Sequence, residues 1–209
     1  MKINYQAILE TIIEQNLKSG RTPQLLLHSC CAPCSSYVLE YLTKYFEVTV
    51  YYYNPNIYPD TEYTKRVVEQ RKFIEEKTFP YPVTFIEGDF DKERFYEMAA
   101  PMHMLPEGSE RCVGCYTLRL EETARLAKEL EYDYFSTTLS ISPMKNASVL
   151  NEIGQKLQEA YEVPYLFSDF KKKEGYKRSI ELSKEYGLYR QDYCGCVYSY
   201  EQRNCMKSS

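Results

Sequence analysis

Tryptophan is absent from this 209-residue sequence, and so are long apolar runs, internal repeats and low-complexity linkers. No apolar run approaches the roughly 20 residues that a membrane-spanning helix needs. The N-terminus lacks the unbroken apolar segment of a signal peptide, so we expect no membrane association and a cytoplasmic location. The net charge of −4 gives no general attraction to nucleic acid, so RNA binding would need a local basic surface.

Tyrosine is abundant where tryptophan is missing, with 22 in the chain. These side chains can serve as ordinary packing residues in the core and on the surface. They can also form a surface on which unpaired RNA bases stack, a common use of aromatic rings in RNA recognition. The composition leaves both interpretations open.

Cysteine is too sparse, at eight residues, for a small secreted domain held together by disulfides. Seven of these cysteines nevertheless fall into three short groups: Cys30, Cys31 and Cys34, then Cys112 and Cys115, then Cys194 and Cys196. In a reducing compartment, clustered thiols indicate metal or redox chemistry. Cys205, in a polar tail, is given no role.

Alternating strands and helices are predicted along the chain. Runs of apolar, β-branched and aromatic residues predict five strands, at residues 25–27, 47–53, 83–87, 134–138 and 164–167. Helical spacing of apolar residues separates them, so the sheet should be parallel and covered by helices on both faces. We expect a single α/β domain over residues 1–209, with residues 168–209 as a helical C-terminal extension that carries Cys194 and Cys196.

A cysteine-bearing turn follows the first predicted strand. Residues 25–27 are three leucines that run directly into residues 28–34, and a helical pattern begins at once. In open α/β sheets, ligands bind outside the carboxyl ends of the strands. The thiols of Cys30, Cys31 and Cys34 are therefore predicted to lie where a ligand would bind.

Four of the cysteines match the ligand set of a four-iron cluster, namely Cys30, Cys31, Cys112 and Cys115. Cys112 and Cys115 begin a predicted helix, whose dipole lowers the pKa of thiols at that end. Zinc also accepts four thiolates, although these pairs lie much further apart than in a zinc ribbon. Buried, inert thiols are the third interpretation.

Cys194 and Cys196 form a different kind of pair. Cysteines two residues apart make a strained, easily reduced disulfide, which suits a two-electron redox role. They would equally complete a second metal site with Cys34, or lie in an exposed turn that has no chemical role.

Five segments, in order over nearly the whole chain, resemble the QueH family of epoxyqueuosine reductases. They are Leu-Leu-Leu-His-Ser-Cys-Cys-Ala-Pro-Cys-Ser-Ser at 25–36, Tyr-Tyr-Asn-Pro-Asn-Ile-Tyr-Pro at 52–59, Glu-Arg-Cys-Val-Gly-Cys-Tyr at 110–116, Thr-Thr-Leu-Ser-Ile-Ser-Pro-Met-Lys-Asn at 137–146 and Tyr-Cys-Gly-Cys at 193–196. Such enzymes remove the epoxide oxygen from epoxyqueuosine at the wobble position of tRNA. The resemblance also implies a Rossmann-like fold, similar to that of nucleotide-binding α-hydrolase-like proteins.

The resemblance implies a [4Fe-4S] cluster on Cys30, Cys31, Cys112 and Cys115, and a redox-active pair at Cys194 and Cys196. A second, mononuclear iron is associated with the family, and its ligands here would come from Cys34, Cys194 and Cys196. Cys34 therefore joins Cys194 and Cys196 as a candidate catalytic residue. The expected partners are a tRNA anticodon loop carrying epoxyqueuosine and an external low-potential electron donor.

The substrate side is less specific. An anticodon loop offers unpaired bases that stack on aromatic rings, and phosphates that bind basic side chains. The candidate substrate-binding residues are Tyr53, Asn54, Tyr58, Arg119, Ser140 and Ser142. Further candidates for phosphate contacts are Lys65, Arg66, Arg71 and the run 171–173, and candidates for proton relay are His28, Tyr116, Asp192 and Tyr193.

Two other functions are possible for a chain with this pattern. An ATP-dependent, thiolase-like tRNA-modifying enzyme of similar fold would carry Ser-Gly-Gly-x-Asp-Ser after the first strand, but residues 28–36 contain no glycine that would let the backbone approach a phosphate. A non-catalytic RNA-binding module stabilised by zinc would use the same cysteines without redox chemistry.

Overall fold

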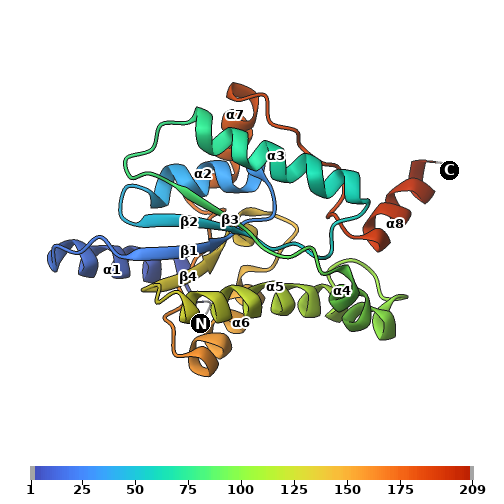
Figure 1. The fold of residues 1–209 in the computed structure, drawn as a ribbon, viewed down its shortest axis with the longest axis horizontal. Coiled ribbons are helices and arrows are strands. Elements are labelled where there is room, and N and C mark those ends of the chain that lie inside the picture. The colour runs from blue at the N-terminus through green and yellow to red at the C-terminus, as the bar shows by residue number, and fades with distance from the viewer. Residues whose placement is uncertain (1–2, 208–209) are drawn as a thin grey trace.

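A four-stranded parallel sheet forms the centre of the computed structural model, which describes residues 3–207 (Figure 1). The strands are β1 (Gln24–His28), β2 (Glu47–Tyr52), β3 (Thr84–Glu87) and β4 (Tyr134–Thr137), in the spatial order β3-β2-β1-β4. Within the central strand, Leu26 is in register with Thr49 on β2 and Phe135 on β4. A strand covered on both faces needs apolar residues throughout, which explains the three consecutive leucines.

The prediction of a fifth strand at residues 164–167 is wrong. This segment makes a single parallel bridge, between Phe135 and Tyr165. Two backbone bonds make this bridge, from the Phe135 amide to the Pro164 carbonyl and from the Leu166 amide to the Phe135 carbonyl. On the outer side, Gln158 Oε1 accepts from the Tyr165 amide over 2.8 Å, and beyond the bridge Asn151 bonds both the amide and the carbonyl of Ser168 over 3.0 and 2.9 Å. The remaining backbone groups are thus satisfied by side chains rather than by a longer ladder.

Helices cover both faces of the sheet. In Figure 1, α2 (Ala32–Leu42), α3 (Asp60–Glu76) and α7 (Gly175–Glu185) lie above it, and α4 (Lys92–Ala99), α5 (Glu110–Glu129) and α6 (Ala147–Tyr161) lie below. Side chains alternate along β1, so Leu25 and Leu27 join a core with α1 (Tyr5–Lys18), α2 and α3, whereas Leu26 joins a second core with α5 and α6. The predicted two-sided cover is confirmed.

The C-terminal part contains α7, followed by α8 (Val197–Lys207), with the Cys194–Cys196 segment between them. Two short 3-10 helices complete the elements, η1 (Ala100–Met102) and η2 (Thr138–Ile141). The outermost residues of the predicted domain, 1–2 and 208–209, lie outside the described residues. None of the helices within residues 3–207 is long and apolar enough to cross a membrane.

The parallel arrangement determines where the chemistry lies. The turn after β1, the loop after β2 and the helix η2 after β4 all leave the same edge of the sheet. The carboxyl edge therefore brings together residues 29–34, 53–59 and 138–146, which come from three of the segments singled out in the sequence.

Candidate metal centre and active site

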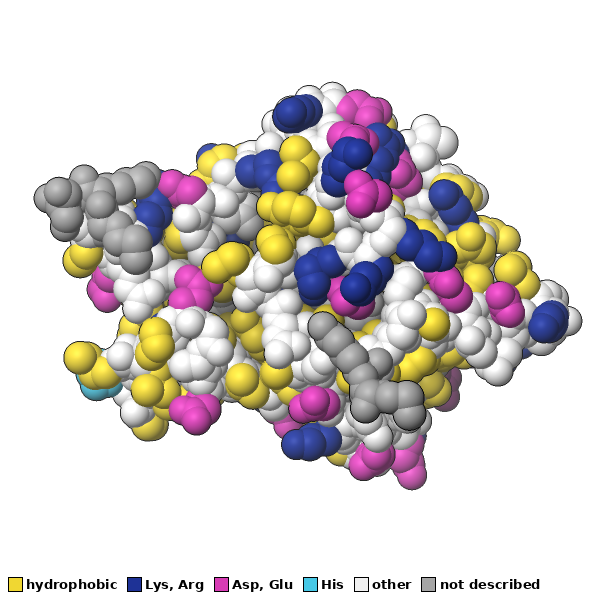
Figure 2. Space-filling view, turned by 180° about the vertical axis from the view of Figure 1, so that it is seen from behind, with side chains coloured by type: hydrophobic (Ala, Val, Ile, Leu, Met, Phe, Trp, Pro, Cys, Tyr) yellow, Lys and Arg dark blue, Asp and Glu magenta, His cyan; other side chains and the backbone are white. Residues whose placement is uncertain are grey.

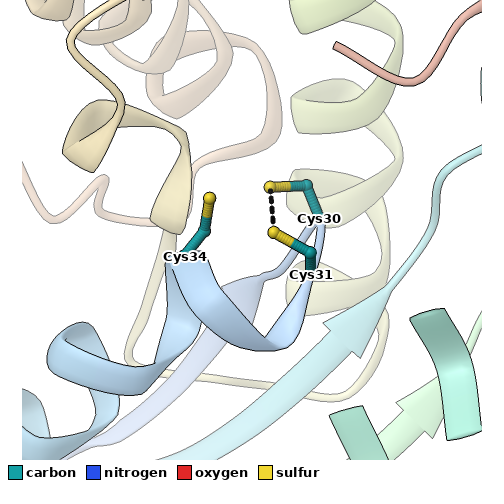
Figure 3. A group of neighbouring side chains, drawn as sticks. All are labelled: Cys30, Cys31 and Cys34. Carbon is teal, nitrogen blue, oxygen red and sulfur yellow. Dashed lines mark hydrogen bonds between the residues drawn. The ribbon is translucent and has the colours of Figure 1, made fainter. Parts of the chain in front are cut away.

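Three cysteine side chains converge at the carboxyl end of β1 (Figure 3). Cys30 and Cys31 lie in the turn, Cys31 is the N-cap of α2, and Cys34 stands on the first turn of that helix. Their Sγ atoms all lie within 4.8 Å of one another, and the Cys30 and Cys31 sulfurs are 3.8 Å apart. Within residues 3–207, this is the one group of at least three His, Cys, Asp or Glu residues whose ligand atoms approach so closely. These cysteines could bind a metal.

Hydrogen bonds among these thiols give the three cysteines different pKa values. Bonds from Cys31 and Cys34 lower the pKa of Cys30 well below its usual range, and Lys145 and Arg119 add positive charge nearby. The bond to Cys30 raises the pKa of Cys31 to about 12, and bonds to both neighbours raise the pKa of Cys34. Cys30 is therefore the most acidic of the three thiols. A metal would displace the remaining protons, because thiolates are the binding form.

Cys112 and Cys115 reach the same region from the start of α5. Cys112 is buried in the core cluster that contains Cys30 and Cys31, and its sulfur accepts from the Gly108 amide over 3.2 Å. Cys115 packs in a separate cluster with Cys196. Burial raises the pKa of Cys115 to about 12.

Cys194 and Cys196 lie in the segment before α8. Both line a small cavity that is also lined by Cys112 and Cys115. Cys194 additionally lines a larger cavity with Cys30 and Cys34. Six cysteines from three distant parts of the chain thus line two adjoining cavities, and Cys31 lies beside them with its sulfur 3.8 Å from that of Cys30. Within residues 3–207, the cysteines form no disulfide in this structure.

Gly195 lets this segment lie close to a buried arginine. Its φ is +125°, which side-chain-bearing residues rarely adopt, and a Cβ at this position would stand 3.1 Å from an Arg66 guanidinium nitrogen. Arg66 is 1% exposed and forms an ion pair of 2.7 Å with Glu62. The Gly195 carbonyl accepts from the Tyr58 amide over 2.8 Å. The pair of cysteines is therefore held by the loop after β2 as well as by its own chain.

Arg119 connects the cysteine turn to α5. It is 3% exposed, donates to Asn54 Oδ1 over 3.2 Å and donates to the Cys115 carbonyl over 3.3 Å. Asn54 in turn donates to the Ser29 carbonyl over 2.8 Å. Burial alone would lower the pKa of Arg119, but the neighbouring Cys115, Cys30 and Cys194 raise it overall. A fixed positive charge therefore stands among the thiols.

The larger cavity has a volume of about 400 Å³, within the range typical of small-ligand sites. Its wall combines three of the thiols with basic, acidic and aromatic side chains: Glu107, Arg119, Lys145, Tyr176, Arg190, Asp192 and Tyr193. Burial lowers the pKa of Lys145, but the surrounding Cys194, Cys30 and Tyr116 raise it overall, so Lys145 keeps its proton at neutral pH.

The structure separates the predicted substrate residues into three sets. Arg119 and Ser142 line the larger cavity. Tyr58 is 37% exposed, and its carbonyl accepts from the Tyr193 hydroxyl over 2.6 Å. Tyr53, Asn54 and Ser140 are at most 2% exposed. Their role in substrate binding stays a prediction, and their contacts here are internal.

The candidates for proton relay also lie in different surroundings. Asp192 and Tyr193 line the larger cavity, and Tyr116 lines the smaller one. His28 is fully buried, between the Tyr53 carbonyl at 3.1 Å and the Thr137 hydroxyl at 3.0 Å. Burial and the charge of Arg119 lower its pKa to about 3, so it is neutral and supports the strand end.

Several residues of the site had no role assigned from the sequence. Lys145, the last but one residue of the 137–146 segment, lines the larger cavity. Gln191 donates from Nε2 to the Cys31 sulfur over 3.2 Å, a contact across the whole chain that no local pattern could indicate.

The comparisons with known proteins agree with one another. A family model described as epoxyqueuosine reductase QueH matches residues 25–202. Three curated relatives carry that same name. The one from Staphylococcus epidermidis is 46% identical over 203 residues, covering 95% of this chain and 85% of the relative. The one from Staphylococcus aureus is 42% identical over 206 residues, covering 97% and 86%. The one from Thermotoga maritima is 37% identical over 185 residues, covering 86% and 91%.

Proposed function

Because the chain belongs to the QueH family of epoxyqueuosine reductases and is therefore an oxidoreductase, we propose that it removes the epoxide oxygen of epoxyqueuosine at the wobble position of tRNA. The two C–O bonds of the epoxide break, an alkene forms and the oxygen leaves as water, which consumes two electrons and two protons. The observation that supports this reaction most is the cavity that places Cys30, Cys34 and Cys194 beside Lys145 and Arg119.

The donor set fits an iron–sulfur centre. Cysteine thiolates are the usual ligands of such clusters. Six thiols line the two cavities, and the thiol of Cys31 lies beside those of Cys30 and Cys34. In this proposal Cys30, Cys31, Cys112 and Cys115 hold a [4Fe-4S] cluster. Cys34, Cys194 and Cys196 remain as the redox-active group or the ligands of a mononuclear iron. When bound, these groups would supply electrons at the cavity floor, which they receive from an external low-potential donor.

Buried positive charges would stabilise this centre. Several thiolates gathered in a low-dielectric region repel one another, and burial alone disfavours each of them. Arg119 and Arg66 are both at most 3% exposed, and Arg119 is fixed by its bonds to Asn54 and the Cys115 carbonyl. Their charges offset those of the thiolates and keep the turn and α5 in place while the centre changes its redox state.

The chain's own residues also bind and protonate the substrate. The larger cavity, of about 400 Å³, can enclose a modified base that has left the anticodon loop, with Tyr176 and Tyr193 as ring faces on its wall. Lys145, which keeps its proton, stands on the same wall and can donate to the departing oxygen. Solvent would then re-protonate Lys145 through the open mouth of the cavity.

The test is turnover of epoxyqueuosine-containing tRNA by protein purified without oxygen, given a low-potential chemical reductant. Nucleosides from the digested tRNA are separated and identified by mass spectrometry. We expect queuosine to replace epoxyqueuosine, and Cys194→Ala to lower the rate by at least about 100-fold. Cys205→Ala is the matched control, since Cys205 is exposed on α8. Epoxyqueuosine left intact by the metal-loaded wild type would contradict the proposal.

A further inference from the structure

Another cavity, called the second cavity from here on, lies beside the larger cavity that Cys30, Cys34 and Cys194 line. Its volume is about 520 Å³, and it lies where the start of α1, the start of α6 and the turn after residue 168 meet. The residues that line it include Lys145, Asp169, Lys171, Lys172 and Lys173. None of the cysteines lines it, so it has no part in the redox chemistry described above.

The wall of this second cavity is strongly basic, with four lysines against one carboxylate. Lys171 forms an ion pair of 3.0 Å with Asp169 and donates to the Ser140 carbonyl over 2.8 Å. Lys172 makes no side-chain hydrogen bond or ion pair with any residue of the described part. The charge is therefore in excess of what the protein itself neutralises. On the face that Figure 2 shows, opposite to the view of Figure 1, several Lys and Arg side chains lie close together near the centre.

A tight turn brings three of these lysines to the cavity. Lys173 and Glu174 both adopt the left-handed region, with φ of 52° and 60°, immediately before α7. A Cβ at Gly175 would stand 2.1 Å from the Phe170 carbonyl oxygen, so the chain can close this turn only with glycine there. Left-handed, side-chain-bearing residues are costly and persist where the surroundings fix them. The lysine run is thus held in place rather than left on a solvated helix face.

Lys145 joins the two cavities, because it lines both. A ligand in the larger cavity is therefore adjacent to the second cavity. Single-stranded RNA extends in both directions from a flipped base as a chain of phosphates, which lysines bind without regard to sequence. We propose that the second cavity binds the backbone phosphate of a nucleotide flanking the modified one. This inference rests on the proposed function and names a subsite of the same substrate.

The experiment measures the steady-state constants of the metal-loaded enzyme on epoxyqueuosine-containing tRNA. The Lys172→Ala/Lys173→Ala double variant should raise KM about tenfold at ~0.1 M salt and leave kcat unchanged, because phosphate contacts position the RNA. The slope of log Kd against log salt, measured by tRNA binding, should fall by about 1. The Lys18→Ala/Lys44→Ala double variant is the control. It removes the same charge from exposed positions near the amino ends of the strands.

A variant that should tighten tRNA binding, rather than weaken it, distinguishes phosphate binding from a structural role. Lys173 forms an ion pair with Glu10, so Glu10→Gln leaves its ammonium free for the RNA. We expect tRNA to bind about twofold to threefold more tightly to this variant. Unchanged KM and salt slope in the lysine double variant would overturn the subsite, and so would an equal loss in the control. A wild type that binds tRNA through these lysines but leaves epoxyqueuosine intact would overturn the proposed function instead.

Discussion

Gln191 and Cys31 are joined by a hydrogen bond of 3.2 Å from the amide Nε2 to the thiol sulfur. The bond connects the segment that carries Cys194 to the turn after β1, although 160 residues separate the two in the sequence. Gln191 also lines the larger cavity. The relation explains how the C-terminal cysteines are kept beside the N-terminal ones.

Gln191→Ala should loosen this connection. We expect the free energy of unfolding to fall by about 1 kcal/mol, the usual net contribution of one hydrogen bond. Cys31 in metal-free protein should also react faster with iodoacetamide, as followed by peptide mass spectrometry. Gln155→Ala, at an exposed position on α6, serves as the control. An unchanged rate at Cys31 would mean that the contact does not shield the thiol.

Gly195→Ala should impair the reaction more than it impairs the fold. The backbone angle of +125° and the Arg66 nitrogen 3.1 Å from the added Cβ both oppose the substitution, at a cost of about 1–3 kcal/mol. Because Cys194 and Cys196 flank this residue, we expect at least tenfold slower turnover. At Gly187, φ is +60° and no atom lies within 4 Å of an added Cβ. Gly187→Ala should therefore cost about 1 kcal/mol and leave turnover intact.

Arg119→Met should raise the pH at which Cys194 ionises in metal-free protein. Burial raises the pKa of Cys194, and the charges of Lys145 and Arg119 partly offset that effect. Removal of the Arg119 charge should therefore shift the pH profile of Cys194 alkylation to higher pH. Arg119→Lys keeps the charge and should shift it less. Both variants lose the bond to Asn54, so each should be about 2 kcal/mol less stable to denaturant.

Glu40→Gln tests the attachment of α7, which contributes Tyr176 to the cavity. Glu40 accepts two bonds of 2.9 Å from Arg178 and one of 3.2 Å from Lys77. The bonds from Arg178, followed by that from Lys77, lower its pKa in the folded protein, although partial burial opposes them. The stabilisation is therefore present above the unfolded pKa of about 4.3 and is lost as the pH falls below it.

At pH 7, we expect the free energy of unfolding of Glu40→Gln to be about 1 kcal/mol below that of the wild type. This value allows for solvent screening of the partly exposed ion pair. The difference from the wild type should shrink as the pH falls below about 4.3. Glu181→Gln breaks a more exposed pair with the same arginine, 3.4 Å long, and should change stability by less than about 0.5 kcal/mol. If the difference in free energy of unfolding between Glu40→Gln and the wild type stays constant with pH, the ion pair is not the cause of that difference.

The sequence predicted the elements whose causes are local. The leucines at 25–27, followed by a proline in the first turn of the next helix, specify a buried strand, a turn and a helix, and that is what the structure contains. The fifth strand does not extend beyond one bridge because side chains of another element bind the backbone where the pairing would continue, as Asn151 does at the Ser168 amide. No periodicity along residues 164–167 could reveal them.

The site was predictable in its residue types but not in its arrangement. Clustered thiols indicated where the chemistry lies, yet the contact of Cys194 with both cavities depends on the path of the whole C-terminal segment. Arg66 was a candidate for phosphate contact, but it is 1% exposed and pairs with Glu62, one turn earlier. Ligand division among the cysteines stays a prediction, since it depends on the bound metal as well as on the chain.

The most direct test of the central claim is the iron, zinc and acid-labile sulfide content of protein purified without oxygen, compared with that of Cys112→Ala. The account predicts about four sulfides and at least four irons per wild-type chain, with a broad brown absorbance. Cys112→Ala should lose both the sulfide and the colour, while Cys205→Ala keeps them. One zinc without sulfide in the wild type, or a full cluster in Cys112→Ala, would contradict the account.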